Sequence, residues 1–408
     1  MSGKRKKKYR IKKGRFIVSM IIILLLAGFI VSRILYGMDK ASFSLNGDKN
    51  ITIEMGAEYT DEGCNKEKAE KEGKVNTSKE GTYEITYTYK GRSLTRKVTV
   101  IDSSAIIMGL KGDAHTIVRE GDEYIESGAF ALYKGKGPIE DIKVSGKVKT
   151  NKPGTYEITY SCEAEGHEQS IVRSVEVVPA DEYTADTDGI PVLMYHYVYT
   201  EGDYPAGLDN NYILDTELEK QLKYLVENDY YFPSFDELRA YIDGRIALPE
   251  KSVILTFDDG QTGFLKYGVP VLEKYKVPAT SFLIGTKGAP KKVKKYRSEY
   301  VQYQSHSYDM HQGGGNIGHG GIISAMDVIS IQEDLEKQAK ISGNNDALAY
   351  PFGDYTENGF AAVTAAGIDC AFTTEQGRVL PGSDFRRLPR VRVDGMASLE
   401  NFIYLLGN

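Results

Sequence analysis

The chain has 408 residues, of which 41% are hydrophobic and 26% are charged. This length suits several domains of roughly 100–200 residues each, and the composition excludes a collagen-like or a wholly disordered chain. Ten of the 51 Lys and Arg residues precede residue 37, and none of the 57 Asp and Glu residues does. The rest of the chain is therefore acidic, which excludes nucleic-acid binding as its main activity.

The N-terminus predicts a single membrane pass. Residues 1–15 form a basic tip, and Phe16–Ser32 is an uncharged apolar run long enough to cross a bilayer. Because positive charge stays on the cytoplasmic side, we expect the tip to be cytoplasmic, residues 16–36 to be the transmembrane anchor, and everything after Tyr36 to be extracellular. A cleaved signal peptide is the alternative, but Ser32–Leu35 lacks a small-x-small cleavage site.

Only three cysteines occur, and they are far apart: Cys64, Cys162 and Cys370. They cannot build a dense disulfide framework or a cysteine-based zinc site. An exported chain with so few cysteines is typical of a bacterial surface, and a Gram-positive type of bacterium is the expected source.

An internal duplication follows the anchor. Gly73–Tyr87 matches Gly146–Tyr160, and both segments alternate with period two in Thr-Tyr-Glu-Ile-Thr-Tyr, as half-buried strands do. We therefore predict two small all-β sandwiches, at residues 42–102 and 105–178. The motifs EYTDEG, GTYEITYTY and RKVTVID resemble the immunoglobulin-like repeats of Gram-positive surface proteins. Such modules serve either as spacers, which we favour, or in weak glycan or wall binding.

Residues 179–189 are acidic and end in Gly, which predicts a linker. From residue 190 to 408, buried-strand runs alternate with helical stretches, which predicts an α/β domain with a parallel sheet or barrel. The expected elements are Ile190–Tyr197, Thr216–Asn228, Ser252–Phe257, Val269–Tyr275, Ala279–Ile284, Val301–Ser305, Ala325–Ile341, Ala347–Tyr350, Thr356–Ala366 and Ala371–Thr374.

Two carboxylates directly follow one of these strands. The apolar run Ser252–Phe257 delivers Asp258 and Asp259 to the strand end, where parallel α/β folds place their sites. Neighbouring side chains there point in different directions, so one carboxylate can bind a metal while the other accepts a proton from water. Asp-Asp-Gly is also common turn chemistry, so the motif alone leaves a structural role open.

Two of the six histidines lie close together at another strand end. Val301–Ser305 is followed by His306, and His311 comes five residues later. Five residues on a helix would separate the side chains by about 140°, so their convergence requires a turn at the strand end. Two imidazoles with one carboxylate form a common zinc-type ligand set.

Four motifs together give the α/β domain a specific resemblance. They are Thr256–Gly260, His306–His311, Tyr350–Gly353 and Ile190–Tyr197. The domain resembles the polysaccharide deacetylase (NodB-homology) domain of carbohydrate esterase family 4, and most of all the branch that contains the poly-N-acetylglucosamine deacetylases. The resemblance spans residues 190–408 and implies a distorted (β/α) barrel.

The resemblance also implies roles for the site residues. Asp259, His306 and His311 would bind a divalent metal, zinc in the first place, with cobalt, nickel and iron suiting the same ligands. Asp258 would be the general base, and the backbone N–H of Phe352 would stabilise the oxyanion.

The chain departs from the family pattern at two places. It ends without the Leu-x-His motif that usually supplies the acid, so we nominate His196, at the end of the domain's first strand, as acid or substrate contact. Ala349 stands where many members have an Arg that orients the base, and Arg390 is the candidate for that task. We expect the glycine-rich segment containing His319 to be a mobile loop over the site.

The sequence therefore predicts a membrane-anchored extracellular hydrolase that removes N-acetyl groups from a polysaccharide, either peptidoglycan or poly-N-acetylglucosamine. An esterase for O-acetylated xylan or a related glycan, and a non-catalytic glycan-binding surface protein, are the alternatives.

Overall fold

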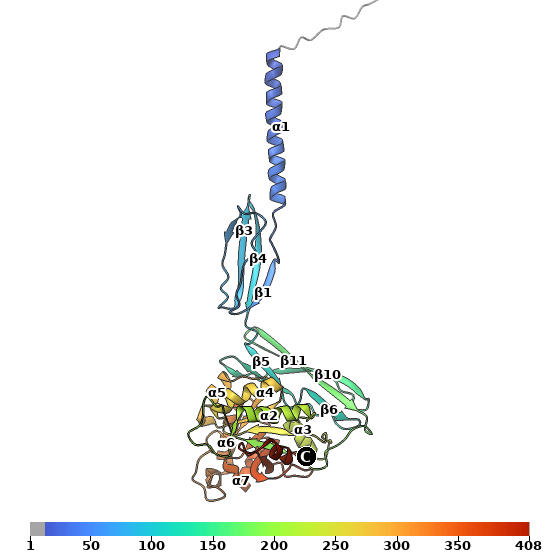
Figure 1. The fold of residues 1–408 in the computed structure, drawn as a ribbon, viewed down its shortest axis with the longest axis vertical. Coiled ribbons are helices and arrows are strands. Elements are labelled where there is room, and N and C mark those ends of the chain that lie inside the picture. Colours follow the sequence, from blue (N-terminus) through green and yellow to red (C-terminus); the bar gives the residue numbers. More distant parts are fainter. Residues whose placement is uncertain (1–12, 408) are drawn as a thin grey trace, which may run out of the picture. The chain divides into compact units, whose positions relative to one another are not determined.

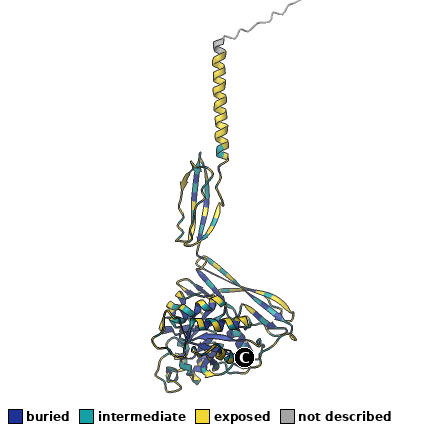
Figure 2. Ribbon diagram, viewed as in Figure 1, coloured by how far each residue is buried: buried dark blue, intermediate teal, exposed yellow. Residues whose placement is uncertain are grey.

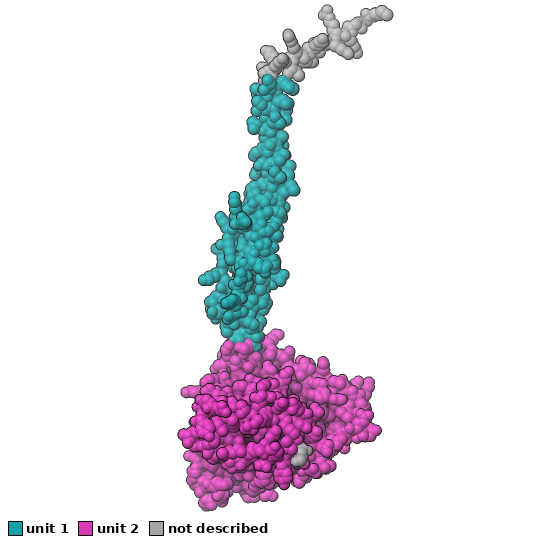
Figure 3. All heavy atoms as spheres, in the orientation of Figure 1, with its two compact units in different colours: residues 1–103 teal, residues 104–408 magenta. Residues whose placement is uncertain are grey.

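The computed structural model describes residues 13–407, and the chain divides into two compact units, residues 1–103 and 104–408 (Figure 3). The predicted cytoplasmic tip falls almost entirely outside the described residues. Helix α1 (Lys13–Ala41) contains a stretch, Phe16–Ala41, that is long and apolar enough to cross a membrane. The apolar side chains from Phe16 to Met38 are exposed, as the yellow part of this helix in Figure 2 shows.

The two repeats contain the same four-stranded sheet. The first repeat has the order β1-β4-β3-β2 and the second β6-β11-β10-β9, with the outer pairs β1/β4 and β6/β11 parallel in both. The second repeat adds a three-stranded sheet, β5-β7-β8, on the other side of its core. The strands are β1 (Asn50–Glu54), β2 (Glu70–Glu72), β3 (Gly81–Tyr89), β4 (Arg92–Ile101), β5 (Ile106–Leu110), β6 (His115–Arg119), β7 (Ala129–Tyr133), β8 (Gly137–Pro138), β9 (Ile142–Gly146), β10 (Gly154–Ala164) and β11 (His167–Val178).

A buried arginine occupies the same place in both repeats. Arg96 on β4 and Arg173 on β11 have no exposed side-chain surface. Arg173 donates to the backbone carbonyls of Lys111 and Gly128 at 2.8 and 3.0 Å, and Arg96 binds the carbonyl of Asp48 at 2.9 Å. A guanidinium offers five donors in a fixed fork, so it can satisfy several carbonyls that a core without water would leave unpaired.

The α/β domain is built on a closed barrel of seven parallel strands within residues 192–392. Its strands are buried along most of their length because helices cover the outside, which is why they read as continuous apolar runs. Ile254–Phe257 forms a parallel pair with Val192–Tyr195 on one side and with Ala279–Leu283 on the other. In order around the barrel the strands are β12 (Val192–Tyr195), β15 (Ile254–Phe257), β16 (Ala279–Leu283), β17 (Val301–Ser305), β18 (Ala347–Ala349), β19 (Cys370–Gln376) and β20 (Leu388–Arg392).

Helices surround the barrel (Figure 1). Their starts are marked by local signals: Ser234 and Glu237 form a capping box, and Asp327 and Thr356 cap two further helices. The helices are α2 (Asp215–Glu227), α3 (Phe235–Ile242), α4 (Val269–Tyr275), α5 (Ala289–Lys295), α6 (Val328–Ser342), α7 (Glu357–Ala365) and α8 (Leu399–Leu405). The predicted α/β domain behind an Ig-like region is confirmed.

The segment predicted as one strand, Ile190–Tyr197, is broken at His196. After β12 the chain turns into β13 (Tyr197–Tyr199), which pairs outside the barrel with β14 (Tyr212–Leu214). His196 therefore lies at the carboxyl end of a barrel strand, beside a separate two-stranded ribbon.

The second repeat covers the amino-terminal ends of the barrel strands. Leu110 and Phe130 line one small cavity together with Val253 and Ala279, which lie where β15 and β16 begin. A Cβ on Gly109 would meet the carbonyl oxygen of Glu299 at 2.1 Å, so only glycine allows this close approach. Apolar side chains of the repeat thus close the barrel floor.

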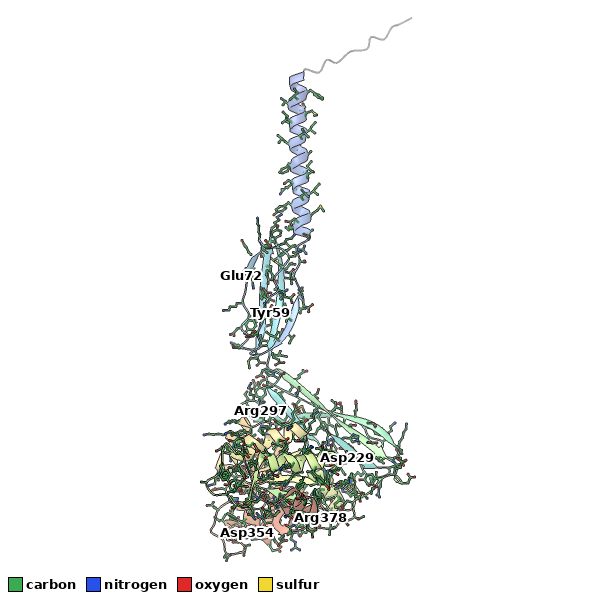
Figure 4. The ribbon with its side chains drawn as sticks, viewed as in Figure 1. Tyr59, Glu72, Asp229, Arg297, Asp354 and Arg378 are labelled. Atoms are coloured by element: carbon green, nitrogen blue, oxygen red, sulfur yellow. The ribbon has the colours of Figure 1, made fainter. Side chains whose placement is uncertain are left out.

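Polar contacts fix the same interface. Lys111 forms an ion pair with Asp346 at 2.8 Å, and Ser127 and Ser234 share a buried hydrogen bond of 2.7 Å. Arg297, labelled in Figure 4, donates to the carbonyls of residues 104 and 105. The predicted linker is also bound in place, since Asp186 donates its N–H to the carbonyl of Leu248.

We predict that residues 104–408, not 190–408, are the stable folding unit. Removing the second repeat exposes the apolar floor of the barrel, so a 190–408 fragment should unfold at least about 5 °C below the 104–408 fragment or aggregate. Thermal unfolding monitored by circular dichroism measures the difference. Equal melting temperatures for the two fragments would contradict this assignment.

Candidate metal centre and catalytic site

Three predicted ligands converge at the carboxyl-terminal edge of the barrel. Asp259 follows β15, and His306 and His311 follow β17. The Nε2 atoms of the two histidines lie 3.4 and 3.3 Å from the same Asp259 oxygen, and one ligand atom from each residue lies within 4.8 Å of the others. Ligands about 2.0–2.1 Å from a tetrahedral ion are roughly 3.3 Å apart, so the set fits a divalent cation such as zinc.

Neighbouring groups orient these ligands. The Nδ1 atom of His306 lies 2.7 Å from the carbonyl oxygen of Ala349, which leaves Nε2 directed at the ligand set. Tyr197 donates its hydroxyl to the second oxygen of Asp259 at 2.7 Å. Burial acts to raise the pKa of Asp259, but the two imidazoles and Tyr197 outweigh it and hold the pKa well below its usual range. Asp259 is therefore ionised, as a metal ligand must be.

Asp258 forms a buried bidentate pair with Arg390. The two guanidinium nitrogens lie 2.8 and 2.7 Å from the two carboxylate oxygens, and neither residue is more than 2% exposed. Burial acts to raise the pKa of Asp258, but the charge and hydrogen bonds of Arg390 leave the pKa below its ordinary value. Arg390 also donates to the carbonyl of Thr373 at 2.9 Å, which fixes the guanidinium.

The backbone is strained at this edge of the barrel. Among residues 13–407, seven residues other than glycine have positive φ, and three of them are at the site: Asp259 at 67°, Ser307 at 69° and Phe352 at 62°. Left-handed backbone at such residues costs about 1–3 kcal/mol each and is retained only where the surroundings enforce it. Such clustering is typical of a functional site.

A cavity of about 300 Å³ opens over these residues. His196 lies on its wall, and burial lowers the pKa of His196 against the opposing effect of Asp258 and Asp259. The ring of Phe352 packs on His311 with centroids 4.4 Å apart. The cavity is lined by His196, Tyr197, Asn211, Asp258, Asp259, His306, His311, His319, Tyr350, Phe352, Thr374 and Arg392.

The glycine-rich loop with His319 is held to the cavity rim by a buried carboxylate. Asp354, labelled in Figure 4, accepts the backbone N–H groups of His319 and Gly321 at 2.9 and 2.8 Å. A Cβ on Gly318 would meet an Asp354 oxygen at 1.9 Å. The loop thus has a definite backbone arrangement, and the His319 side chain is exposed.

The sequence singles out neither the lining residues Tyr197, Asn211, Thr374 and Arg392 nor Asp354, which holds the loop. The sequence predicts Tyr197 as the last residue of a strand, and its place directly after His196, at the same strand end as the ligands, is the signal that marks it. Asp354 follows the Tyr350–Gly353 motif and carries no pattern that distinguishes it from other turn aspartates.

A closed barrel that gathers acidic and imidazole side chains at its carboxyl edge defines an α/β-barrel enzyme. Residues 245–371 match the family model for polysaccharide deacetylase, and residues 43–100 and 108–177 match that for the Ig-like domain of bacterial surface proteins. The chain thus carries a polysaccharide deacetylase domain behind an Ig-like region, which confirms the resemblance read from the motifs.

Curated relatives carry the name poly-beta-1,6-N-acetyl-D-glucosamine N-deacetylase. That of Staphylococcus aureus strain MRSA252 is 27% identical over 203 residues, covering 46% of this chain and 69% of the relative. That of Staphylococcus epidermidis is 28% identical over 207 residues, covering 47% and 71%. Among solved structures, the Streptococcus pyogenes deacetylase PplD in complex with acetate has a TM-score of 0.47 at 23% identity, covering 54% of this chain and 99% of its own.

We predict that Asp259→Asn abolishes stoichiometric binding of zinc or cobalt to the full-length protein. Tyr197→Phe should weaken binding by about 10–100-fold, because Asp259 loses the hydroxyl that orients it. Calorimetric titration with Zn²⁺ and the visible absorption of bound Co²⁺ measure both effects. Asp141→Asn, at an exposed position of the second repeat, is the matched control and should bind normally.

We predict that Arg390→Met shifts the pH profile of acetate release. Without the guanidinium, burial dominates and the pKa of Asp258 rises, so the acidic limb of kcat/KM moves to higher pH and activity at pH 7 falls. Loss of one partner of a buried pair also costs about 3–5 kcal/mol of stability, so profiles are measured below the melting temperature of the variant. An acidic limb at the wild-type pH would show that Arg390 does not control this carboxylate.

Proposed function

We propose that the protein is a membrane-anchored, extracellular, divalent metal-dependent deacetylase that hydrolyses N-acetyl groups of a polysaccharide containing N-acetylglucosamine. One observation carries this proposal: a buried, ionised Asp258 stands next to the Asp259, His306 and His311 set at the mouth of a cavity. A proton acceptor beside a cation site is the arrangement that hydrolysis of an amide by water requires.

The names of the staphylococcal relatives favour poly-β-1,6-N-acetylglucosamine as the substrate. Peptidoglycan is the second candidate, because a chain anchored in the membrane and carrying Ig-like modules of the bacterial surface-protein type would work close to the wall. Both polymers present the same acetamide group, so the site chemistry is shared.

In the proposed reaction, water adds to the acetyl carbonyl and the C–N bond breaks to give acetate and a free sugar amine. Lewis-acid polarisation of the carbonyl and of water is the chemistry that a divalent cation, held by Asp259, His306 and His311, supplies when bound. Asp258 takes the proton from the attacking water, and Arg390 keeps it ionised for that task. The proton that Asp258 has accepted is then available for the departing amine.

Phe352 and His196 complete the proposed site. The left-handed conformation of Phe352 fixes its backbone at the cavity wall, where its N–H can donate to the developing oxyanion. Because burial lowers its pKa, His196 is neutral in the resting enzyme, and a neutral imidazole is a hydrogen-bonding group before it is an acid. We therefore assign His196 first to contact with the substrate.

The apolar helix α1 supports a single-pass anchor with the deacetylase outside the cell. The apolar side chains of this helix from Phe16 to Leu35 are exposed, and a bilayer is the environment that buries such a surface. We assign the first repeat to a spacer role and the second to support of the barrel.

We predict that the full-length protein in detergent micelles, supplied with zinc or cobalt, releases acetate from β-1,6-linked N-acetylglucosamine pentamer. Asp258→Asn should lower the rate by at least about 10²-fold while leaving metal binding intact. Chitopentaose, peptidoglycan and acetylated xylan are assayed side by side with the same enzyme. The preferred substrate then separates matrix polymer from cell wall.

Two results would overturn the proposal. Acetate release only from xylan would make the protein an O-acetyl esterase. Metal binding without acetate release from any of the four substrates would make it a glycan-binding protein.

A further inference from the structure

The ribbon formed by β13 and β14 has one buried face and one tyrosine face. Val198 and Ile213 point inward and are each 1% exposed. Their strand neighbours Tyr197, Tyr199 and Tyr212 alternate with them and remain partly exposed, as the period of two in a strand requires. Four tyrosines, these three and Tyr204 in the following loop, are called the tyrosine ladder below.

The four rings of the tyrosine ladder form a row in space, in which each ring contacts the next. The ring centroids of Tyr197 and Tyr212 are 4.8 Å apart, those of Tyr212 and Tyr199 are 6.4 Å apart, and those of Tyr199 and Tyr204 are 5.3 Å apart. The ladder is therefore one continuous aromatic surface.

The ladder begins inside the catalytic cavity and leads away from it. Tyr197 lines the cavity and binds the proposed metal ligand Asp259, and Asn211, next to Tyr212, lines the cavity as well. Tyr199 and Tyr204 lie beyond the cavity lining, and Tyr204 is 64% exposed. An aromatic surface of this kind that continues a polar cavity is typical of a ligand-binding groove.

The loop carrying Tyr204 is fixed in place. The N–H of Asp203 donates to the carbonyl of Thr200 at 3.0 Å, and the carboxylate of Asp203 accepts the hydroxyl of Tyr267 at 2.6 Å. A turn that is held by these two hydrogen bonds thus exposes Tyr204 to solvent. Burial of an aromatic ring of this size would be favourable.

We propose that the tyrosine ladder is the subsite that binds the sugar units adjoining the one whose acetyl group enters the cavity. The inference rests on the proposed function and adds to it a binding site for the polymer outside the catalytic cavity. The apolar C–H face of a pyranose ring packs on an aromatic ring, while its hydroxyls bond to phenol groups or remain in water.

The charge around the ladder narrows the class of glycan further. Tyr199 lies in the field of the carboxylates of Glu201, Asp215 and Glu217. These negative charges repel a polyanionic glycan and favour a neutral chain or one that already carries protonated amines. The ladder therefore suits the substrate polymer both before and after its neighbouring units are deacetylated.

The test compares chain lengths in the full-length protein. Wild-type kcat/KM for acetate release should be much higher on a pentamer of N-acetylglucosamine than on the dimer. Tyr204→Ala and Tyr199→Ala should each lower kcat/KM on the pentamer by about tenfold, mainly through KM, and lower it less on the dimer. Tyr204→Phe, which keeps the ring, should restore most of the pentamer value.

Binding without turnover gives an independent readout. In the Asp258→Asn background, calorimetric titration with the pentamer should show a Kd about tenfold weaker when Tyr204 is also changed to Ala. Tyr404→Ala removes an exposed tyrosine of α8 that lies outside the ladder and is the matched control.

The outcomes separate this inference from the proposed function. Equal losses on pentamer and dimer, or no loss on the pentamer in either tyrosine variant, would overturn the ladder as a subsite while leaving a deacetylase. A wild-type protein that releases no acetate from either substrate, and whose Asp258→Asn variant nevertheless binds the pentamer through Tyr204, would overturn the deacetylase and leave the ladder as a glycan-binding surface.

Discussion

The site depends on a guanidinium that has no access to water. Arg390 lies inside the barrel and joins three strands: it belongs to β20, it donates to the carbonyl of Thr373 on β19, and it holds Asp258 at the end of β15. An isolated carboxylate at that depth would be protonated, because burial penalises its charge. The pair of Asp258 and Arg390 therefore keeps the proposed base ionised, and it also links β20 to the end of β15.

The sequence reveals those site residues that adjoin strong local patterns. Asp258 and Asp259 follow an apolar strand, and His306 follows another, so parallel strands alone place them at one edge of a barrel. The partner of Asp258 is 132 residues away in sequence, and only an apparent gap in the family pattern pointed to Arg390. Tyr197 carries only its place next to the predicted strand end as a signal, because its role depends on a break in the strand at His196 that no residue propensity indicates.

The same contrast holds for the fold. Period-two alternation predicts the long strands of both repeats, and strand-helix alternation predicts the α/β domain. Arg96 and Arg173 escape such reasoning, since arginine in a strand is normally read as a solvent-facing residue, whereas here it satisfies carbonyls inside each repeat. The docking of the second repeat rests on contacts such as Lys111 with Asp346, which are remote in sequence and carry no periodic signal.

The closed floor of the barrel also determines how a pulling force passes through residues 104–408. Arg297 donates a hydrogen bond to the carbonyl of Ser104, the first residue of this unit. The barrel strands run from the floor made by the second repeat to the edge that holds the predicted ligands. A force applied between residue 104 and the carboxyl-terminal edge of the barrel therefore acts along the strands. Hydrogen bonds between strands that are loaded along their length share the force in shear instead of opening one by one, so the arrangement of Asp259, His306 and His311 at that edge resists such a force.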